Sequence, residues 1–186
     1  VSMPTWASVL HWIVLLTCLA FGLLMMYSAI AQLNGLTIDS ALSQDHVKSY
    51  LWMIAYLFAT MGMSFYACVK LYYKNITGYI SFFLVLLFFS IWTGLISSQT
   101  VVMEIIKRVG DTGSVSFLSS VPPVMTYVFI IPAIAIFFIF IILLKYLKPL
   151  SKQDIVVITI YIIFFLVMAP LHLNDYMKET VQSDLI

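Results

Sequence analysis

The chain has 186 residues, of which 63% are hydrophobic and 9% are charged, and its mean hydropathy is +1.08. A typical soluble domain carries about 25% charged residues, so this composition excludes an ordinary soluble fold. Nine basic and eight acidic residues leave a net charge of +1, which gives no general attraction to nucleic acid. The sequence therefore indicates an integral membrane protein, whose partners are expected to be lipids and either other membrane subunits or further copies of the chain itself.

The chain opens with a long apolar segment. Residues 1–38 contain no Asp, Glu, Lys or Arg. This segment has neither a basic n-region nor a small-residue cleavage pattern, so we interpret it as a retained membrane span rather than a signal peptide. Four further apolar segments follow, and each can hold a helix close to the roughly 20 residues that cross a bilayer. The predicted spans are residues 6–30, 49–69, 78–98, 122–144 and 155–171.

These segments lack the alternating pattern of barrel strands, so helices are the expected spanning elements. The predicted fold is a single all-α domain over residues 1–186, a bundle of about five transmembrane helices. If residues 155–171 do not cross, the bundle has four spans, because that segment has only 17 residues. With five spans, the two termini lie on opposite sides of the membrane.

Of the histidine, acidic and basic residues, only His11 lies inside a predicted span. Its neighbours Trp6 and Trp12 are typical of an aromatic belt at the membrane interface, which makes an interfacial histidine the simple interpretation. The alternative is a haem axial ligand or a hydrogen-bonding partner of a quinone. A bis-histidine haem needs a second imidazole at the same depth, and neither His46 nor His172 is expected on that side.

Small residues recur every four positions in two spans, and such rows let helix backbones approach closely. We expect them to mark packing between these two helices or against a partner subunit. Pro132, inside the fourth span, removes one backbone donor and is expected to kink that helix. The rows are Thr60, Ser64 and Cys68 in the second span, and Ser90, Gly94 and Ser98 in the third.

The segment after the third span reads VVMEIIKRV over residues 101–109. Its apolar residues share one helical face, whereas Glu104, Lys107 and Arg108 lie away from that face. This pattern predicts a short helix lying on the membrane interface.

Basic residues orient the predicted bundle, because short cytoplasmic loops are enriched in lysine and arginine. The two short connectors between spans two and three and between spans four and five hold five lysines against one acid, Asp154. We therefore expect these connectors and the N-terminus on the inner side, and the C-terminus outside. The sequon at Asn75 falls in an inner connector, so no glycosylation is expected there. The five lysines are Lys70, Lys74, Lys145, Lys148 and Lys152.

Two histidine and aspartate pairs are expected on the outer side. Asp45 and His46 precede the second span, and His172 and Asp175 follow the fifth. His172 and Asp175 are three residues apart, so they would share one side of a continuing helix. Two imidazoles with carboxylates would suit zinc, copper or iron. The simpler interpretation is that these residues cap helices and meet lipid headgroups.

The sequence contains no nucleophile elbow, phosphate-binding glycine loop, HExxH or CxxC motif. The favoured hypothesis is a non-catalytic integral subunit or scaffold of a larger membrane complex, such as an energy-converting or electron-transfer assembly with a contribution to a quinone or haem pocket. The alternatives are a small oligomeric transporter or channel component, and a membrane enzyme with a metal at its outer face. The membrane would be a bacterial cytoplasmic membrane or an organelle membrane, and haem or a divalent metal are the cofactors considered.

Overall fold

The computed structural model describes the backbone of residues 2–38, 44–111 and 124–184, and the side chains of residues 2–34, 51–95 and 127–175. These residues form long helices and short connectors. The elements are α1 (Thr5–Ile38), α2 (Gln44–Tyr72), α3 (Ile76–Asp111), α4 (Val124–Leu143), the 3-10 helix η2 (Leu144–Tyr146) and α5 (Lys152–Asp184).

Five stretches of the described helices are long and apolar enough to cross a membrane, which confirms the predicted all-helical bundle. The fifth stretch, Lys152–Asp175, has 24 residues and is longer than the 17-residue segment predicted from the sequence. At 1.5 Å per residue it covers about 36 Å, which exceeds the roughly 30 Å of hydrocarbon in a bilayer. This helix is therefore long enough to cross, and whether it does so stays a prediction.

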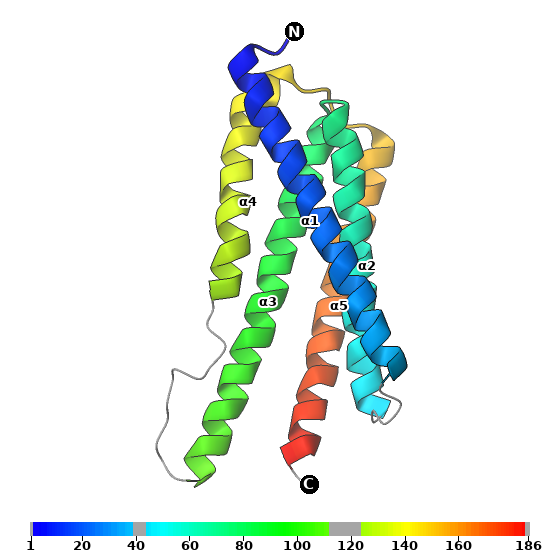
Figure 1. The fold of residues 1–186 in the computed structure, drawn as a ribbon, viewed down its shortest axis with the longest axis vertical. Helices are drawn as coiled ribbons and strands as arrows, with labels where there is room; N and C mark the ends of the chain where they lie inside the picture. Colours follow the sequence, from blue (N-terminus) through cyan, green and yellow to red (C-terminus); the bar gives the residue numbers. More distant parts are fainter. Residues whose placement is uncertain (1, 39–43, 112–123, 185–186) are drawn as a thin grey trace.

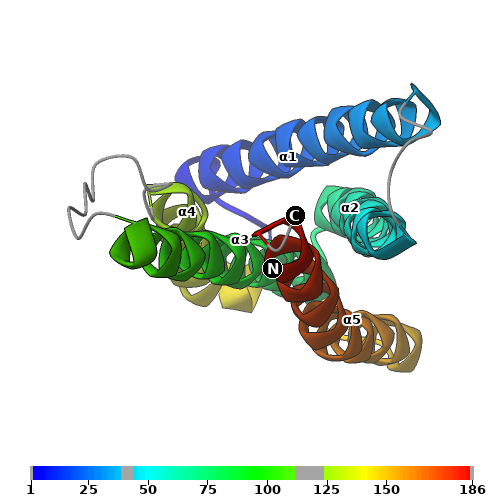
Figure 2. The same cartoon turned by 90° about the horizontal axis from the view of Figure 1, so that it is seen from below.

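Successive helices run up and down the long axis of the molecule (Figure 1). The start of α1, the α2–α3 connector and the α4–α5 connector lie together at one end, which carries the five lysines and is called the lysine end from here on. The other end is called the opposite end. Seen along the bundle, α2 and α3 lie between α1 and α5, while α4 lies beside α3 (Figure 2). The two central helices therefore position the others.

Aromatic side chains fill the middle of the bundle. Phe89 of α3 packs edge-on against Phe129 of α4 at 4.6 Å between ring centroids, and against Phe21 of α1 at 5.7 Å. Phe88 stacks on Phe165 of α5 at 4.2 Å. Each aromatic pair of this kind contributes about 0.5–1.5 kcal/mol beyond its buried area. These contacts attach α1, α4 and α5 to α3.

Helix α4 is the least enclosed of the five. Only 17% of its apolar stretch is buried within the chain, compared with 56% for α3. Pro132 lies inside this helix. The kink that we expect from this proline stays a prediction. Most of the surface of α4 is therefore available to lipid or to another protein.

Two predicted boundaries differ from the structure. Residues 101–109 are helical, but they continue α3 without a break as far as Asp111 instead of forming a separate helix. Helix α5 likewise continues past Leu171, through Pro170 and the predicted exit, to Asp184. In both places the residues after the apolar run include good helix formers, such as Glu104 in α3 and Lys178 in α5, so the helix continues beyond the apolar run.

Candidate functional site

A dense set of polar contacts at the lysine end surrounds Asp154. Its side chain is 1% exposed, in the first turn of α5. Lys70 of α2 forms an ion pair with it at 2.8 Å, and the hydroxyl of Tyr66, one turn earlier on α2, donates a hydrogen bond to the same carboxylate oxygen. Thr77 of α3 donates to the other oxygen at 2.8 Å. One buried carboxylate thus joins three helices.

The start of α5 also fixes Asp154 locally. The backbone N–H of Asp154 donates to Ser151 Oγ at 3.2 Å, and the N–H of Ser151 lies 3.4 Å from Asp154 Oδ2. This reciprocal pattern is a capping box, with Ser151 at the N-cap and Asp154 in the place usually held by Glu. Negative charge at a helix N-terminus is further stabilised by the helix dipole. The carboxylate is therefore held by its own helix as well as by α2 and α3.

The two connectors at the lysine end are hydrogen-bonded to each other through their backbones. The N–H of Lys148 donates to the carbonyl of Lys74 at 2.8 Å, and the N–H of Ile76 donates to the carbonyl of Lys148 at 3.0 Å. Asn75 Oδ1 accepts from the backbone N–H of Thr77 at 3.0 Å, which caps the start of α3. The sequon asparagine thus has a structural role in this connector.

Helix α2 ends in a Schellman motif. The N–H of Asn75 donates to the carbonyl of Lys70 at 3.0 Å, and the N–H of Lys74 donates to the carbonyl of Leu71 at 2.9 Å. Lys74 adopts a φ of 55°, in the left-handed region that normally favours glycine. A Cβ added to Gly78 would lie 2.7 Å from the backbone nitrogen of Leu71, so only glycine fits this close turn between α2 and α3.

His11 is buried inside the bundle, at 2% exposure, whereas Trp6 and Trp12 are 53% and 47% exposed. The interfacial interpretation therefore suits the two tryptophans and does not suit the histidine. His11 Nε2 donates to the carbonyl of Leu71 at 2.7 Å, and in the neutral ring Nδ1 then accepts from the hydroxyl of Tyr79, also at 2.7 Å. Both ring nitrogens thus connect α1 to α2 and α3; the haem or quinone role stays a prediction.

The small-residue row of α2 faces α1 and α5. The Cys18 thiol of α1 donates to the carbonyl of Ser64 at 3.3 Å. Thr60 Oγ1 lies 3.3 Å from the hydroxyl of Tyr161 of α5. The observed neighbours of this row are α1 and α5, whereas the prediction paired it with the third span or with a partner subunit.

At the opposite end, His172 and Asp175 contact different helices. The His172 ring packs against Trp92 of α3 at 5.6 Å between centroids. Asp175 Oδ2 accepts a hydrogen bond from Trp52 Nε1 of α2 at 3.1 Å. Helices α2 and α5 are therefore neighbours at this end, which the sequence could not establish, and the two side chains extend toward different neighbours.

The four-residue metal site remains a prediction. Asp45 and His46 belong to the first turn of α2, but their side chains lie outside the described residues. Among the side chains that are described, no three His, Cys, Asp or Glu residues are grouped as metal ligands.

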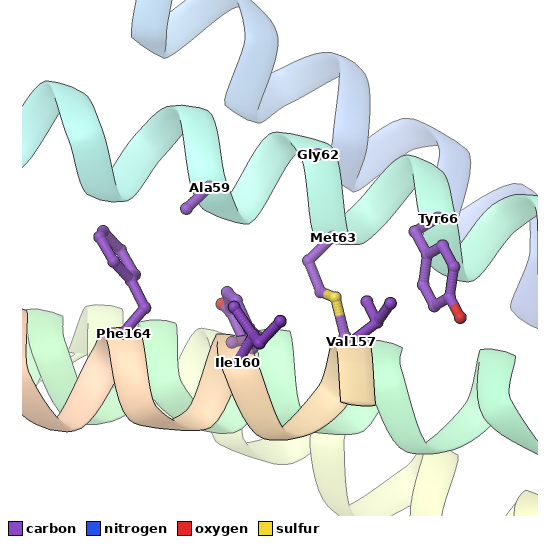
Figure 3. A pocket seen from close by; sticks show the side chains of 8 residues that line it. Ala59, Gly62, Met63, Tyr66, Val157, Ile160 and Phe164 are labelled. Atoms are coloured by element: carbon purple, nitrogen blue, oxygen red, sulfur yellow. The ribbon is translucent and has the colours of Figure 1, made fainter. Parts of the chain in front are cut away.

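Two apolar hollows open on the sides of the bundle. A groove of about 450 Å³ runs between α2 and α5, lined by Ala59, Gly62 and Ile160 among others (Figure 3). A smaller hollow of about 230 Å³ lies between α3 and α4, lined by residues such as Phe83 and Phe137. The side chains that line the two hollows are mainly apolar, and their arrangement does not suggest acid–base chemistry. Hollows with such linings suit hydrocarbon chains.

Sequence reasoning missed Asp154 as an organising residue, because it assigned this aspartate to a connector. The available signal was the spacing S-x-x-D over residues 151–154 immediately before an apolar run, which is typical of a capping box. Tyr66 and Lys70, one helical turn apart near the end of a span, were a second signal.

Comparisons with models of protein families, with curated proteins and with solved structures find no match to this chain.

Proposed function

We propose that the chain is an integral membrane protein that crosses the bilayer five times, with its lysine end on the inner face. Large apolar side chains are exposed on the outer surfaces of the helices, for example Leu16 at 59%, Ile131 at 63% and Ile160 at 61%. Such surface is favourable in hydrocarbon and unfavourable in water. The five lysines gathered at one end agree with the enrichment of basic residues in short inner loops.

Within that membrane, we infer that the chain acts as a non-catalytic structural subunit of a larger complex. The observation that carries this proposal is the use of its buried polar groups. Asp154, His11, Thr60 and Cys18 each bond a neighbouring helix. A catalytic site instead needs several polar groups that converge on one substrate-sized space.

Three buried polar atoms among the described residues have no hydrogen-bond partner there: the hydroxyls of Tyr56 and Ser81 and the indole nitrogen of Trp92. None of these three residues lines either of the two hollows described above. Ser81 and Trp92 are eleven residues apart on α3, about 16 Å along the helix. That distance is too large for one small ligand to bridge both at hydrogen-bonding range.

Purification from native membranes in a mild detergent tests this function. The tagged chain is expected to emerge with other membrane polypeptides at fixed stoichiometry, as judged by native mass, and to support no ion flux when reconstituted alone in liposomes. A chain that purifies without partners and conducts ions would instead establish the transporter alternative. Elemental analysis and a haem absorbance scan of the same sample test the metal and haem predictions.

Photo-crosslinkers on α4 sharpen this experiment, because α4 is the least enclosed helix. A probe at Ile131, which is 63% exposed, is expected to capture a partner polypeptide. A probe at Ala133, which is fully buried two residues away, is expected to react within the chain and serves as the matched control. Equal capture from both positions would contradict a defined partner surface.

A further inference from the structure

The groove between α2 and α5 is long, open at the side and apolar. Ala59 and Gly62 form part of its α2 wall, and Ile160 and Phe164 belong to its α5 wall (Figure 3). A Cβ built on Gly62 meets no atom within 4 Å, which shows how much space the missing side chain leaves. The two helices are neighbours, but they leave this groove open along their contact.

In a bilayer this groove has to be filled. Water in it would find few polar partners, and an empty apolar space forfeits dispersion contacts along its walls. A hydrocarbon chain fills it without either cost. The groove lies inside the apolar stretches Leu51–Tyr72 and Lys152–Asp175, so it lies at the depth of lipid acyl chains if the chain spans the membrane as proposed above.

One end of the groove adjoins positive charge. Tyr66 and Val157 close the groove toward the lysine end (Figure 3). One turn beyond Tyr66 lies Lys70, which is 27% exposed and gives one contact to Asp154. An ammonium group has three donors, so Lys70 has donors beyond the one used by Asp154. Lys152 is exposed at the start of α5, on the other wall.

The surrounding connectors increase this positive charge. Lys74, Lys145 and Lys148 are also exposed at this end. Within the described residues of the two connectors, Asp154 is the acid that could offset them, and it is already paired with Lys70. The groove therefore combines a hydrocarbon slot with a cationic rim, which is complementary to an anionic phospholipid.

We propose that the α2–α5 groove binds an acyl chain of an anionic phospholipid from the leaflet at the lysine end, with its phosphate between Lys70 and Lys152. This site rests on the proposed membrane placement and is independent of the subunit role. The lipid would fill the space between α2 and α5 and add to their contact. It would thereby act as a structural component of the bundle.

Titration of the purified chain in a neutral detergent tests the site. Native mass spectrometry with phosphatidylglycerol and with phosphatidylcholine of the same acyl chains measures binding to each lipid. We expect one retained phosphatidylglycerol and binding of phosphatidylcholine weaker by about 25-fold, because each of the two lysines near an anionic headgroup contributes about a factor of five. Equal binding of the two lipids, or no retained lipid, would overturn the proposal.

Variants distinguish the contribution of the apolar groove from that of the lysines at its end. Gly62→Leu fills open space and is expected to fold and to lose the retained lipid, whereas Val69→Phe, at a 54% exposed position of α2, is expected to keep it. Lys152→Glu is expected to lower the preference for phosphatidylglycerol by at least about fivefold. Retention that is unchanged in Gly62→Leu would also overturn the site.

The outcome is distinguishable from a failure of the proposed function. A chain that stays folded in detergent but shows no lipid preference rejects the lipid site and leaves the subunit role standing. A chain that binds phosphatidylglycerol yet conducts ions alone rejects the subunit role and leaves the lipid site standing. A chain that is folded and monodisperse without detergent rejects the membrane placement, and with it both proposals.

Discussion

The two ends of the bundle are held together in different ways. At the lysine end, short connectors bring α2, α3 and α5 into a network of an ion pair, side-chain hydrogen bonds and backbone bonds around Asp154. At the opposite end, within the described residues, Trp52 and Asp175 join α2 to α5 by a hydrogen bond, and His172 packs on Trp92. Among the side chains that the structure describes, polar contacts thus gather at the lysine end, whereas those at the opposite end make mainly ring contacts and one hydrogen bond.

The difference indicates that a few polar contacts can position long apolar helices when these contacts lie where the chain connectivity is short. Helices in hydrocarbon gain little from burying apolar surface against one another, so packing and hydrogen bonds decide their positions. Polar contacts beside two short connectors reinforce each other, because the chain already brings the same helices together. The lysine end is therefore expected to dominate the stability of the fold.

The largest effect is expected from Asp154→Ala. The substitution leaves Lys70, Tyr66 and Thr77 without their shared acceptor, and we expect the free energy of unfolding in detergent to fall by about 3 kcal/mol. Asp175→Ala is the matched control at the opposite end, where one hydrogen bond is lost and about 1 kcal/mol is expected. Denaturant unfolding that gives equal losses would contradict the contrast between the two ends.

A smaller loss is expected from Gly78→Ala. The new Cβ would lie 2.7 Å from the backbone nitrogen of Leu71, so the α2–α3 turn has to open, at a cost of about 2 kcal/mol. Gly62→Ala adds the same methyl group where no atom lies within 4 Å and is expected to be neutral or slightly stabilising. Melting temperatures of the two variants in one detergent provide the comparison, and a similar drop in both would show that helical glycine in general is required.

His11→Phe tests whether α1 depends on the lysine end. The variant keeps a ring of similar shape but loses the bonds to Leu71 and Tyr79, and we expect about 1.5 kcal/mol of destabilisation. Trp12→Phe changes an exposed neighbour and is expected to leave the unfolding midpoint unchanged. A His11→Phe protein with wild-type stability would show that the two hydrogen bonds of His11 do not stabilise the fold.

The smallest effect is expected from Lys74→Gly, and its sign is opposite. Lys74 has a φ of 55°, which costs an ordinary side chain about 1 kcal/mol and costs glycine little. We therefore expect a gain of up to about 1 kcal/mol in unfolding free energy. Tyr73→Gly, at the preceding position where φ is negative, is expected to give no gain. A loss of stability in Lys74→Gly would mean that the lysine side chain contributes more than its backbone strain costs.

The sequence predicted the helical spans because apolar length is set by the thickness of a bilayer, and this property is local. It also predicted which lysines share an end, since helices that span alternate in direction. The partners of Asp154 could not be predicted in this way. They come from three helices, and their contact depends on the rotation of each helix about its axis, which short connectors and packing determine together.

His11 illustrates the same limit. Helix α1 is apolar on all sides, so no polar stripe indicates which face is buried, and the sequence could place His11 only by its depth. The aromatic neighbours Trp6 and Trp12 suggested the interface, whereas the structure turns His11 inward toward Leu71 and Tyr79. The Asp45 and His46 pair remains a prediction, because their side chains lie outside the described residues.

The most direct test of the five-span arrangement is the sidedness of the two chain ends. Single cysteines at Ser2 and at Ser183, each in a background with Cys18→Ala and Cys68→Ala, are labelled in sealed vesicles with a membrane-impermeant maleimide. We expect the two positions to be labelled from opposite sides, with Ser2→Cys on the inner face together with the lysine end. Labelling of both positions from the same side would contradict the five-span bundle.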